Sequence, residues 1–253
     1  MLKNLKNLVI NNFPVGSRKI YHTINKFLYN GNNYYCPICE KGYSRFLPGP
    51  DSIRSNSKCP GCNSLERHRL LWLYLNSELK ILTSKIKLLN IAPDYATQNK
   101  IKSLVNVDYA SVDLETPLAM YREDLTKLSF KDNSFDAILC YHVLEHIEDD
   151  KKAILELFRV LKPGGWAILQ TPIDGDREHT FEDFTITSAE ERNKAFGQSD
   201  HVRIYGRDYF LRLRNAGFFV KEDTFVNKFS EFEITKYVLD KNEIIFLCTK
   251  LAN

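Results

Sequence analysis

The stretch that decides the fold runs from residue 124 to residue 172 and reads DLTKLSFKDNSFDAILCYHVLEHIEDDKKAILELFRVLKPGGWAILQTP. Its segment FDAILC, at 135–140, is a short apolar run that predicts a buried strand. A helix is expected next, because Asp149 or Asp150 can cap its start and an apolar stripe recurs at helical spacing, formed by Ile154, Leu157, Phe158 and Leu161. Pro163-Gly164-Gly165 should stop that helix, and WAILQTP, at 166–172, predicts the next strand.

The alternation of strands and helices continues on both sides of this stretch. Strands are predicted at 87–92, 106–114, 217–225 and 243–250, and helices near 97–105 and at 209–216. Such alternation is typical of a parallel sheet with helices on both faces. We therefore expect an α/β fold over residues 64–253, with a Rossmann-like, doubly wound, mostly parallel sheet.

Composition and charge exclude several classes of protein. The chain has 253 residues, of which 43% are hydrophobic and 26% are charged, as in globular rather than disordered chains. Its formal net charge of +3 is too small to indicate nucleic-acid binding by itself. No apolar run approaches the roughly 18 residues of a membrane span, and the first residues lack the apolar block of a secretory signal. We therefore expect a soluble, cytoplasmic protein.

Four of the six cysteines form two closely spaced pairs. Cys36 and Cys39 make the first pair, and Cys59 and Cys62 make the second after nineteen intervening residues. This spacing predicts a zinc-ribbon-like module at 36–63 in which four thiolates hold a structural Zn²⁺ ion. Iron accepts the same four sulfurs, and a redox dithiol is the rival interpretation. The other two cysteines, Cys140 and Cys248, lie in apolar runs and are expected to be buried.

Residues 1–35 form a basic, asparagine-rich arm. Pro14-Val15-Gly16 interrupts its apolar pattern, which predicts two short helical pieces. One interpretation is that the arm packs against the main domain. The other is that its apolar face, fringed by lysine and arginine, contacts a membrane surface or a partner.

Polar residues follow several predicted strands, at the edge where an open α/β sheet binds its ligands. Asp113 ends the second strand, twenty-three residues after Asn90, near the offset expected for an acid that holds a ribose diol. Asp124 precedes the third strand, and Tyr141 with His142 follows it. This pattern predicts a bound nucleoside.

Several ordered motifs resemble one family. The stretch 124–172 is similar to the middle of class I S-adenosylmethionine-dependent methyltransferases of the "type 11" group. CPIC, CPGCNSLERHRLLWLYL, LLNIAPD and FGQSDHVRIYGRDY resemble a bacterial subfamily with an N-terminal cysteine module. The resemblance implies S-adenosylmethionine as methyl donor. It also implies cofactor contacts by residues at the ends of the first three strands and in the segment before the third: Ile91, Ala92, Pro93, Asp113, Leu114, Asp124, Leu125, Tyr141 and His142.

The chain departs from that family in the loop after its first strand. Such loops normally contain a GxGxG-like run, because glycine lets the backbone come close to the ligand. Here the loop is Ala92-Pro93-Asp94-Tyr95-Ala96, without glycine.

Candidate acceptor-side residues lie after the strand at 166–172. His201 is the candidate general base, with Asp174 or Asp200 orienting it, although a structural role for His201 is the alternative. The acidic residues could instead hold a divalent ion beside the acceptor. Arg177, Arg203 and Arg207 would suit a phosphate or carboxylate on the acceptor. Glu145 and His146 either face the acceptor or cap the sheet.

Three functions are compatible with these patterns. The leading one is methylation, with O-methylation favoured, of a small-molecule, nucleotide-sugar or glycan acceptor in polysaccharide biosynthesis or secondary metabolism. A second is an RNA methyltransferase whose cysteine module binds RNA, although the small net charge makes a nucleic-acid partner unlikely. A third is a non-catalytic scaffold. The sequence leaves the oligomeric state open.

Overall fold

A computed structural model gives the structure of the protein, and it describes residues 24–50 and 54–252. Most of the predicted arm, residues 1–23, lies outside the described residues; residues 24–28 are helical. The chain divides into two compact units. One comprises Lys80–Asp94, Ile101–Phe225 and Ile244 onward, and the other comprises the chain up to Leu79 with Tyr95–Lys100 and Val226–Glu243.

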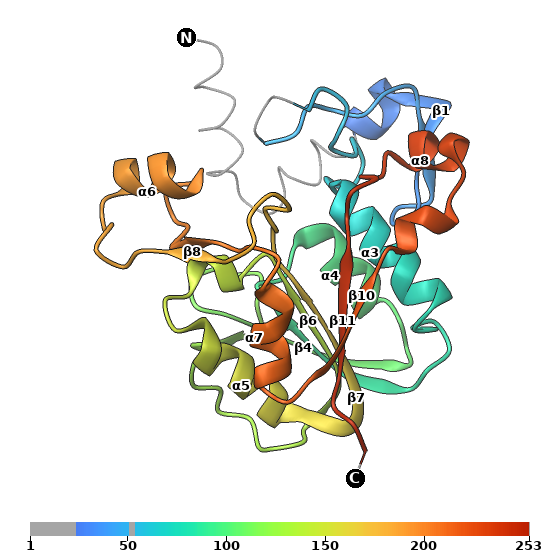
Figure 1. Cartoon of the computed structure of the whole chain (residues 1–253). Coiled ribbons are helices and arrows are strands. Elements are labelled where there is room, and N and C mark those ends of the chain that lie inside the picture. The colour runs from blue at the N-terminus through green and yellow to red at the C-terminus, as the bar shows by residue number, and fades with distance from the viewer. Residues whose placement is uncertain (1–23, 51–53, 253) are drawn as a thin grey trace. The chain divides into compact units, whose positions relative to one another are not determined.

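The larger unit is built on a seven-stranded sheet of order β10-β11-β7-β6-β3-β4-β5 (Figure 1). The strands are β3 (Ile86–Ile91), β4 (Val107–Asp113), β5 (Tyr121–Arg122), β6 (Phe135–Tyr141), β7 (Leu161–Gln170), β10 (Phe219–Asp223) and β11 (Ile245–Thr249). The first five pair in parallel, whereas β11 pairs antiparallel with both β7 and β10. The expected Rossmann-like, mostly parallel α/β fold is confirmed.

The order of the strands shows where a ligand site is expected. The chain begins the sheet at β3, adds β4 and β5 on one side, and then returns to add β6 and β7 on the other. Strand order therefore reverses between β3 and β6. In open α/β sheets this reversal leaves a crevice outside the carboxyl ends of the strands.

Helix α5 (Asp150–Val160) connects β6 to β7 and forms for the predicted reasons. The side chain of Asp149 caps it by accepting a hydrogen bond from the Lys152 N–H at 3.0 Å. Its buried face, formed by Ala153, Ile154, Leu157 and Val160, packs into the core. Cys140 and Cys248 lie in the same core and are fully buried, as predicted.

The helix ends earlier than the sequence suggested. Leu161 is already extended, with ψ of 134°, and β7 runs through Pro163, Gly164 and Gly165 to Gln170. Gly164 has φ of +78°, and the pairing of β6 with β7 shifts register at this point. The Pro-Gly-Gly segment is thus an irregular start to the strand, and glycine allows its left-handed backbone.

The chain from Thr171 to Asp223 completes the larger unit. It contains the two-stranded sheet of β8 (Phe181–Glu182) and β9 (Arg203–Ile204), with α6 (Ala189–Phe196) between them. Helix α7 (Tyr209–Asn215) follows, and its Tyr209 and Leu213 enter the core beside α5 (Figure 1). The short helix η1 (Leu144–His146) lies between β6 and α5.

The smaller unit holds the cysteine pairs. Strands β1 (Asn30–Cys36) and β2 (Lys41–Tyr43) form a hairpin, and helix α3 (Glu66–Ser77) follows the second pair. The segments η2 (Phe225–Lys228), which starts in the larger unit, and α8 (Glu231–Tyr237) come from the C-terminal part of the chain. Helix α4 (Tyr95–Lys102) is divided between the two units. Among the residues that the structure describes, no helix has the length and apolar character needed to span a membrane.

Candidate functional site

The four paired cysteines converge on one point in the smaller unit. The Cys36 and Cys62 sulfurs lie 3.6 Å apart, and the Cys39 and Cys59 sulfurs lie 3.7 Å apart. All four sulfurs lie within 4.8 Å of one another. None of these cysteines forms a disulfide. Each of these two short sulfur–sulfur distances thus joins a cysteine of the first pair to a cysteine of the second.

The two cysteine turns have the same backbone design. In each turn, the residue after the second cysteine donates its N–H to the carbonyl of the first: Glu40 to Cys36 at 2.8 Å and Asn63 to Cys59 at 2.9 Å. Both donors have left-handed backbones, with φ of 55° for Glu40 and 63° for Asn63. Such turns point two sulfurs to the same side.

Two hydroxyl groups contact three of the four sulfurs. The hydroxyl of Ser64 lies 3.4 Å from the Cys36 sulfur and 3.2 Å from the Cys62 sulfur, and the hydroxyl of Tyr43 lies 3.3 Å from the Cys39 sulfur. Ser64 does not cap the following helix α3, whose N-cap is Leu65. Ser64 therefore serves the sulfur cluster instead.

A buried arginine holds this module together. Arg69 of α3 is fully buried and donates to the carbonyl oxygens of Ser57, Ser64, Tyr237 and Val238. Burial holds the pKa of its guanidinium below the usual value, although the nearby cysteines and Glu66 act in the opposite direction. The sequence did not single out Arg69 among the basic residues near the cysteines. Its position on the buried face of α3 was the available signal.

In the larger unit, the loop after β3 has an unusual backbone. Ile91 is buried at the end of the strand, and Ala92 follows it with φ of +46°. The Ala92 N–H donates to the Val112 carbonyl at 2.9 Å, which ties the loop to β4. Pro93 is buried next to it. An alanine thus adopts the left-handed backbone for which glycine is usually selected.

Asp113 lies at the end of β4, beside this loop. Its Oδ1 accepts hydrogen bonds from the N–H groups of Glu115 and Thr116, both at 2.7 Å. These two bonds fix the carboxylate at the carboxyl end of the strand. The next residue, Leu114, is 54% exposed.

Asp124 and Leu125 lie on the segment between β5 and β6. Oδ1 of Asp124 accepts hydrogen bonds from the N–H (2.8 Å) and the hydroxyl (2.9 Å) of Thr126, so this aspartate shapes a turn. Leu125 is buried in the core. The structure thus gives Leu125 a packing role.

Tyr141 and His142 follow β6, the strand next to β3. His142 has φ of +56°, and its N–H donates to the Gln170 carbonyl at 2.8 Å. Two neighbouring strands, β3 and β6, are therefore each followed by a left-handed residue other than glycine, at the reversal of strand order. Backbone strain of this kind is typical of functional sites.

Glu145, on η1, is buried among histidines. Its Oε2 accepts a hydrogen bond from the Thr171 hydroxyl at 2.9 Å, and its Oε1 lies 3.4 Å from Nδ1 of His142 and 4.0 Å from Nε2 of His146. Burial favours a raised pKa, but the hydrogen bond and charge of His142 outweigh it and hold the pKa of Glu145 below its usual value.

His201 joins this cluster from the chain before β9. Its ring lies 4.8 Å from the His146 ring, centroid to centroid, and the neighbouring Val202 N–H donates to the Glu145 carbonyl. Burial and the charge of His146 lower the pKa of His201. Asp200, expected to orient His201, instead places its Oδ2 3.4 Å from Nδ1 of His146.

Asp174, the other candidate partner of His201, contacts a different residue. Its Oδ2 lies 3.5 Å from Nε of Arg177, and its Oδ1 accepts a hydrogen bond from the Asp176 N–H. Arg207 is exposed and donates to the Gly175 carbonyl. The structure thus brings His201 together with His146 and Glu145, and it pairs Asp174 with an arginine.

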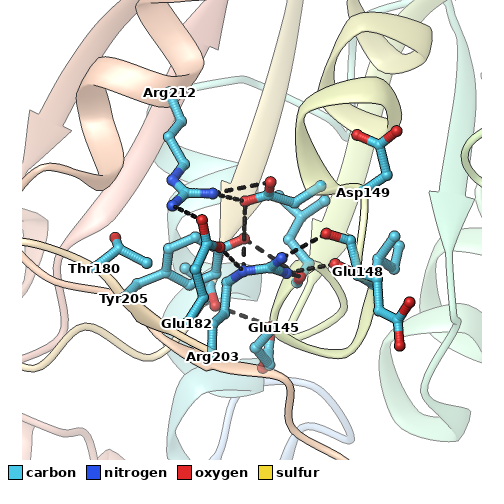
Figure 2. A network of polar contacts seen from close by, with 12 residues as sticks. Glu145, Glu148, Asp149, Thr180, Glu182, Arg203, Tyr205 and Arg212 are labelled. Carbon is cyan, nitrogen blue, oxygen red and sulfur yellow. Dashed lines mark hydrogen bonds and ion pairs between the residues drawn. The ribbon is translucent and has the colours of Figure 1, made fainter. Parts of the chain in front are cut away.

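Arg203 has a structural role that differs from the predicted contact with the acceptor. Its side chain is fully buried and donates to three carbonyl oxygens of the η1 segment, those of Leu144, Ile147 and Glu148. It also donates to Glu182 at 3.0 Å. Figure 2 shows its guanidinium between Glu182 and the chain at Glu148. These contacts occupy the fork of donors that an acceptor anion would need.

A ring of alternating charges completes this network. Arg212 contacts Asp150 at 2.8 Å and Glu182 at 3.0 Å, and the Tyr205 hydroxyl donates to Asp150 at 2.6 Å (Figure 2). Arg203 closes the ring, at 3.8 Å from Asp150. Sequence reasoning missed the network because its members are far apart in the chain.

Comparison with known proteins finds similarity in the middle of the chain. Residues 90–169 match the family model described as "Methyltransferase domain". A Bacteroides fragilis protein named demethylmenaquinone methyltransferase is 40% identical over 75 residues, which are 30% of this chain and 31% of that protein. A Paracidovorax citrulli protein named ubiquinone biosynthesis O-methyltransferase is 32% identical over 72 residues, 28% of this chain and 30% of that protein. The matched stretch thus covers less than a third of either relative.

A solved structure supports the fold. The 1,6-didemethyltoxoflavin-N1-methyltransferase of Burkholderia thailandensis, solved with its substrate and S-adenosylhomocysteine, superposes with a TM-score of 0.51. The two are 12% identical, and the match covers 73% of this chain and 78% of that one. At this identity the likeness concerns the fold alone. The chain thus matches the methyltransferase domain model over residues 90–169, and its fold is similar to that of a solved methyltransferase.

Proposed function

We propose that this protein transfers a methyl group from S-adenosylmethionine to a small-molecule acceptor. The observation that carries the proposal is the arrangement at the reversal of strand order. There, Ala92 after β3 and His142 after β6 adopt left-handed backbones, and Asp113 ends β4. The donor supplies an activated methyl group and leaves as a neutral thioether.

The residues at this edge fit the parts of such a cofactor. The carboxylate of Asp113 is fixed at the strand end by two N–H groups, and an acid at this place suits the two hydroxyls of a ribose. At Ala92 and Pro93 the chain turns away from β3, so its backbone can pass close to the methionine part of S-adenosylmethionine. Tyr141 and His142 line the opposite side of the reversal point. Asp124 and Leu114 complete the proposed set.

A small acceptor agrees with the relatives, two of which are named for reactions on quinone precursors. Within this class we favour O-methylation of a sugar, nucleotide-sugar or glycan hydroxyl. A general-base role for His201, oriented by Asp174 or Asp200, stays a prediction.

We also propose that the four cysteines hold a structural zinc ion. Four sulfurs about 2.3 Å from a tetrahedral zinc ion lie about 3.8 Å from one another. The separations of 3.6 and 3.7 Å agree with that arrangement. Hydroxyls at three of the sulfurs and the buried cation Arg69 suit a centre with excess negative charge. Four protein ligands leave no position for a substrate, so the ion would stabilise the module.

Calorimetric titration with S-adenosylmethionine and S-adenosylhomocysteine tests the main proposal. We expect both to bind with micromolar affinity, and we expect Asp113→Ala to weaken binding at least tenfold. Asp108→Ala is the matched control, because Asp108 lies on the same strand with a 74% exposed side chain. No binding by the wild-type protein, or equal binding by both variants, would contradict the proposal.

A further inference from the structure

We infer that Glu145, His146 and His201 form a binding site for a divalent first-row transition-metal ion, separate from the four cysteines. One ligand atom from each residue lies within 4.8 Å of those of the other two. Two imidazoles and one carboxylate are a donor set for zinc, iron or cobalt, and three protein ligands leave coordination positions open.

The carboxylate of Glu145 is prepared for such an ion. It is almost completely buried, at 2% exposure, and the Thr171 hydroxyl donates to Oε2 at 2.9 Å. The other oxygen, Oε1, faces the histidines. Carboxylates that bind metals are commonly oriented in this way by a hydrogen bond on the second oxygen.

Hydrogen bonding also orients His146 for binding an ion. Its Nδ1 lies 3.2 Å from the Asp200 carbonyl oxygen and 3.4 Å from the Asp200 carboxylate. A carbonyl oxygen only accepts hydrogen bonds, so Nδ1 carries the proton and Nε2 keeps its lone pair. Nε2 is the atom that faces Glu145, at 4.0 Å. A histidine that donates from one nitrogen to a carbonyl or carboxylate and binds through the other is the usual arrangement at metal sites.

The backbone that bears two of the three ligands is held rigidly. Arg203 donates to the carbonyl oxygens of Leu144, Ile147 and Glu148, which flank Glu145 and His146. The same arginine lies two residues after His201, so one side chain fixes both halves of the cluster. The Val202 N–H adds a direct bond to the Glu145 carbonyl at 3.0 Å.

The ligand atoms need only a small movement to bind an ion. Two ligands about 2.1 Å from a metal are about 3.0–3.4 Å apart at octahedral or tetrahedral angles. The distance of 4.0 Å between His146 Nε2 and Glu145 Oε1 therefore has to close by about 0.6–1 Å.

The inference deepens the proposed function and rests on it for its purpose. Glu145 and His146 follow β6 a few residues after Tyr141 and His142, so two of the three ligands lie next to the chain segment proposed to line the cofactor. An ion with open positions would hold an acceptor through its oxygen atoms, such as two neighbouring hydroxyls, and would favour the ionised form of the oxygen to be methylated.

Cobalt is the probe that distinguishes this site from the cysteines. Co²⁺ binds imidazole well but follows Zn²⁺ in affinity, so it leaves zinc in a loaded four-cysteine site. We expect zinc-loaded protein to bind one further equivalent of Co²⁺, with weak visible bands and without the intense near-ultraviolet absorption of cobalt–thiolate bonds. Calorimetry gives the stoichiometry without any need for activity.

Variants then assign the ligands. Glu145→Gln and His201→Asn should each weaken Co²⁺ binding more than tenfold, and Thr171→Val should weaken it about 10–100-fold through the loss of orientation. The control is His179→Asn, a histidine in the same unit whose side chain is 80% exposed. Circular dichroism checks that each variant is folded.

The outcomes separate this inference from the proposed function. No additional Co²⁺ bound by the wild-type protein at millimolar concentration would overturn the metal site, whatever the variants do. Binding that is equal in wild type, Glu145→Gln and His201→Asn would also overturn it. Titration with S-adenosylmethionine in the absence of cobalt tests the cofactor proposal independently, so either can fail while the other holds.

Discussion

Replacing Arg203 with methionine should destabilise the larger unit strongly. The guanidinium is fully buried and supplies hydrogen bonds to three carbonyl oxygens and to Glu182. Methionine keeps much of the volume but donates nothing, so these acceptors lose their partner, and Glu182 keeps only Arg212. Removing one partner of a buried charge network costs about 3–5 kcal/mol.

Urea denaturation followed by circular dichroism measures this loss. For a unit of this size, 3–5 kcal/mol corresponds to a fall in Tm of roughly 6–20 °C. Arg207→Met is the matched control, because Arg207 is exposed and donates to a single carbonyl, that of Gly175. It should cost no more than about 1 kcal/mol.

Co²⁺ binding by the two variants also shows whether Arg203 positions the cluster residues in addition to stabilising the fold. Because Arg203 fixes the chain around Glu145 and His146, Arg203→Met should weaken Co²⁺ binding even where the protein remains folded. A loss of less than about 1 kcal/mol in Arg203→Met would refute the reasoning, because it would show that the three carbonyls find other partners.

Three further changes test other parts of the structure. Ala92→Gly should raise the free energy of unfolding by about 0.5–1 kcal/mol, because it relieves a left-handed alanine at φ of +46°, and urea denaturation that showed a loss would contradict the strained loop. Cys59→Ser should remove zinc and lower Tm, whereas Cys248→Ala, at a buried cysteine outside the cluster, should keep full zinc content by metal analysis. Burial raises the pKa of Glu182, but Arg212 and Arg203 outweigh it and hold the pKa below its usual 4.5. The stability that ionised Glu182 contributes is therefore fully present above pH 4.5 and is lost as the pH falls further. The difference in stability between wild type and Glu182→Gln should accordingly shrink below pH 4.5, and a wider difference would contradict this role.

The parts of the fold that depend on local pattern were predictable. The apolar run 135–140 forms a buried strand as expected, and Ile154 and Leu157 of the predicted stripe are buried on α5, whereas Leu161 belongs to β7. The four cysteines were predictable as a cluster because their spacing is itself the signal. The start of β7 was not, because both a helix end and an irregular strand accept Pro-Gly-Gly.

The acceptor-side cluster could not be assembled from the sequence. His201 and Glu145 are 56 positions apart, and the contacts of Arg203 with the η1 region and the hydrogen bond from the Val202 N–H to the Glu145 carbonyl bring them together. For the same reason Arg203 resembled an exposed anion-binding residue, since nothing in its neighbours signals full burial. Asp200 was placed in the right region, but its side chain faces His146 rather than His201.

Hydrogen exchange measured with and without S-adenosylhomocysteine tests the central claim most directly, because it reports where the cofactor binds. The account predicts slower exchange of the amides at residues 91–94, 113–116 and 141–143, and unchanged exchange in the cysteine module at 36–62. Protection confined to the cysteine module, or binding without protection after β3, β4 and β6, would contradict the cofactor site at the carboxyl ends of these strands.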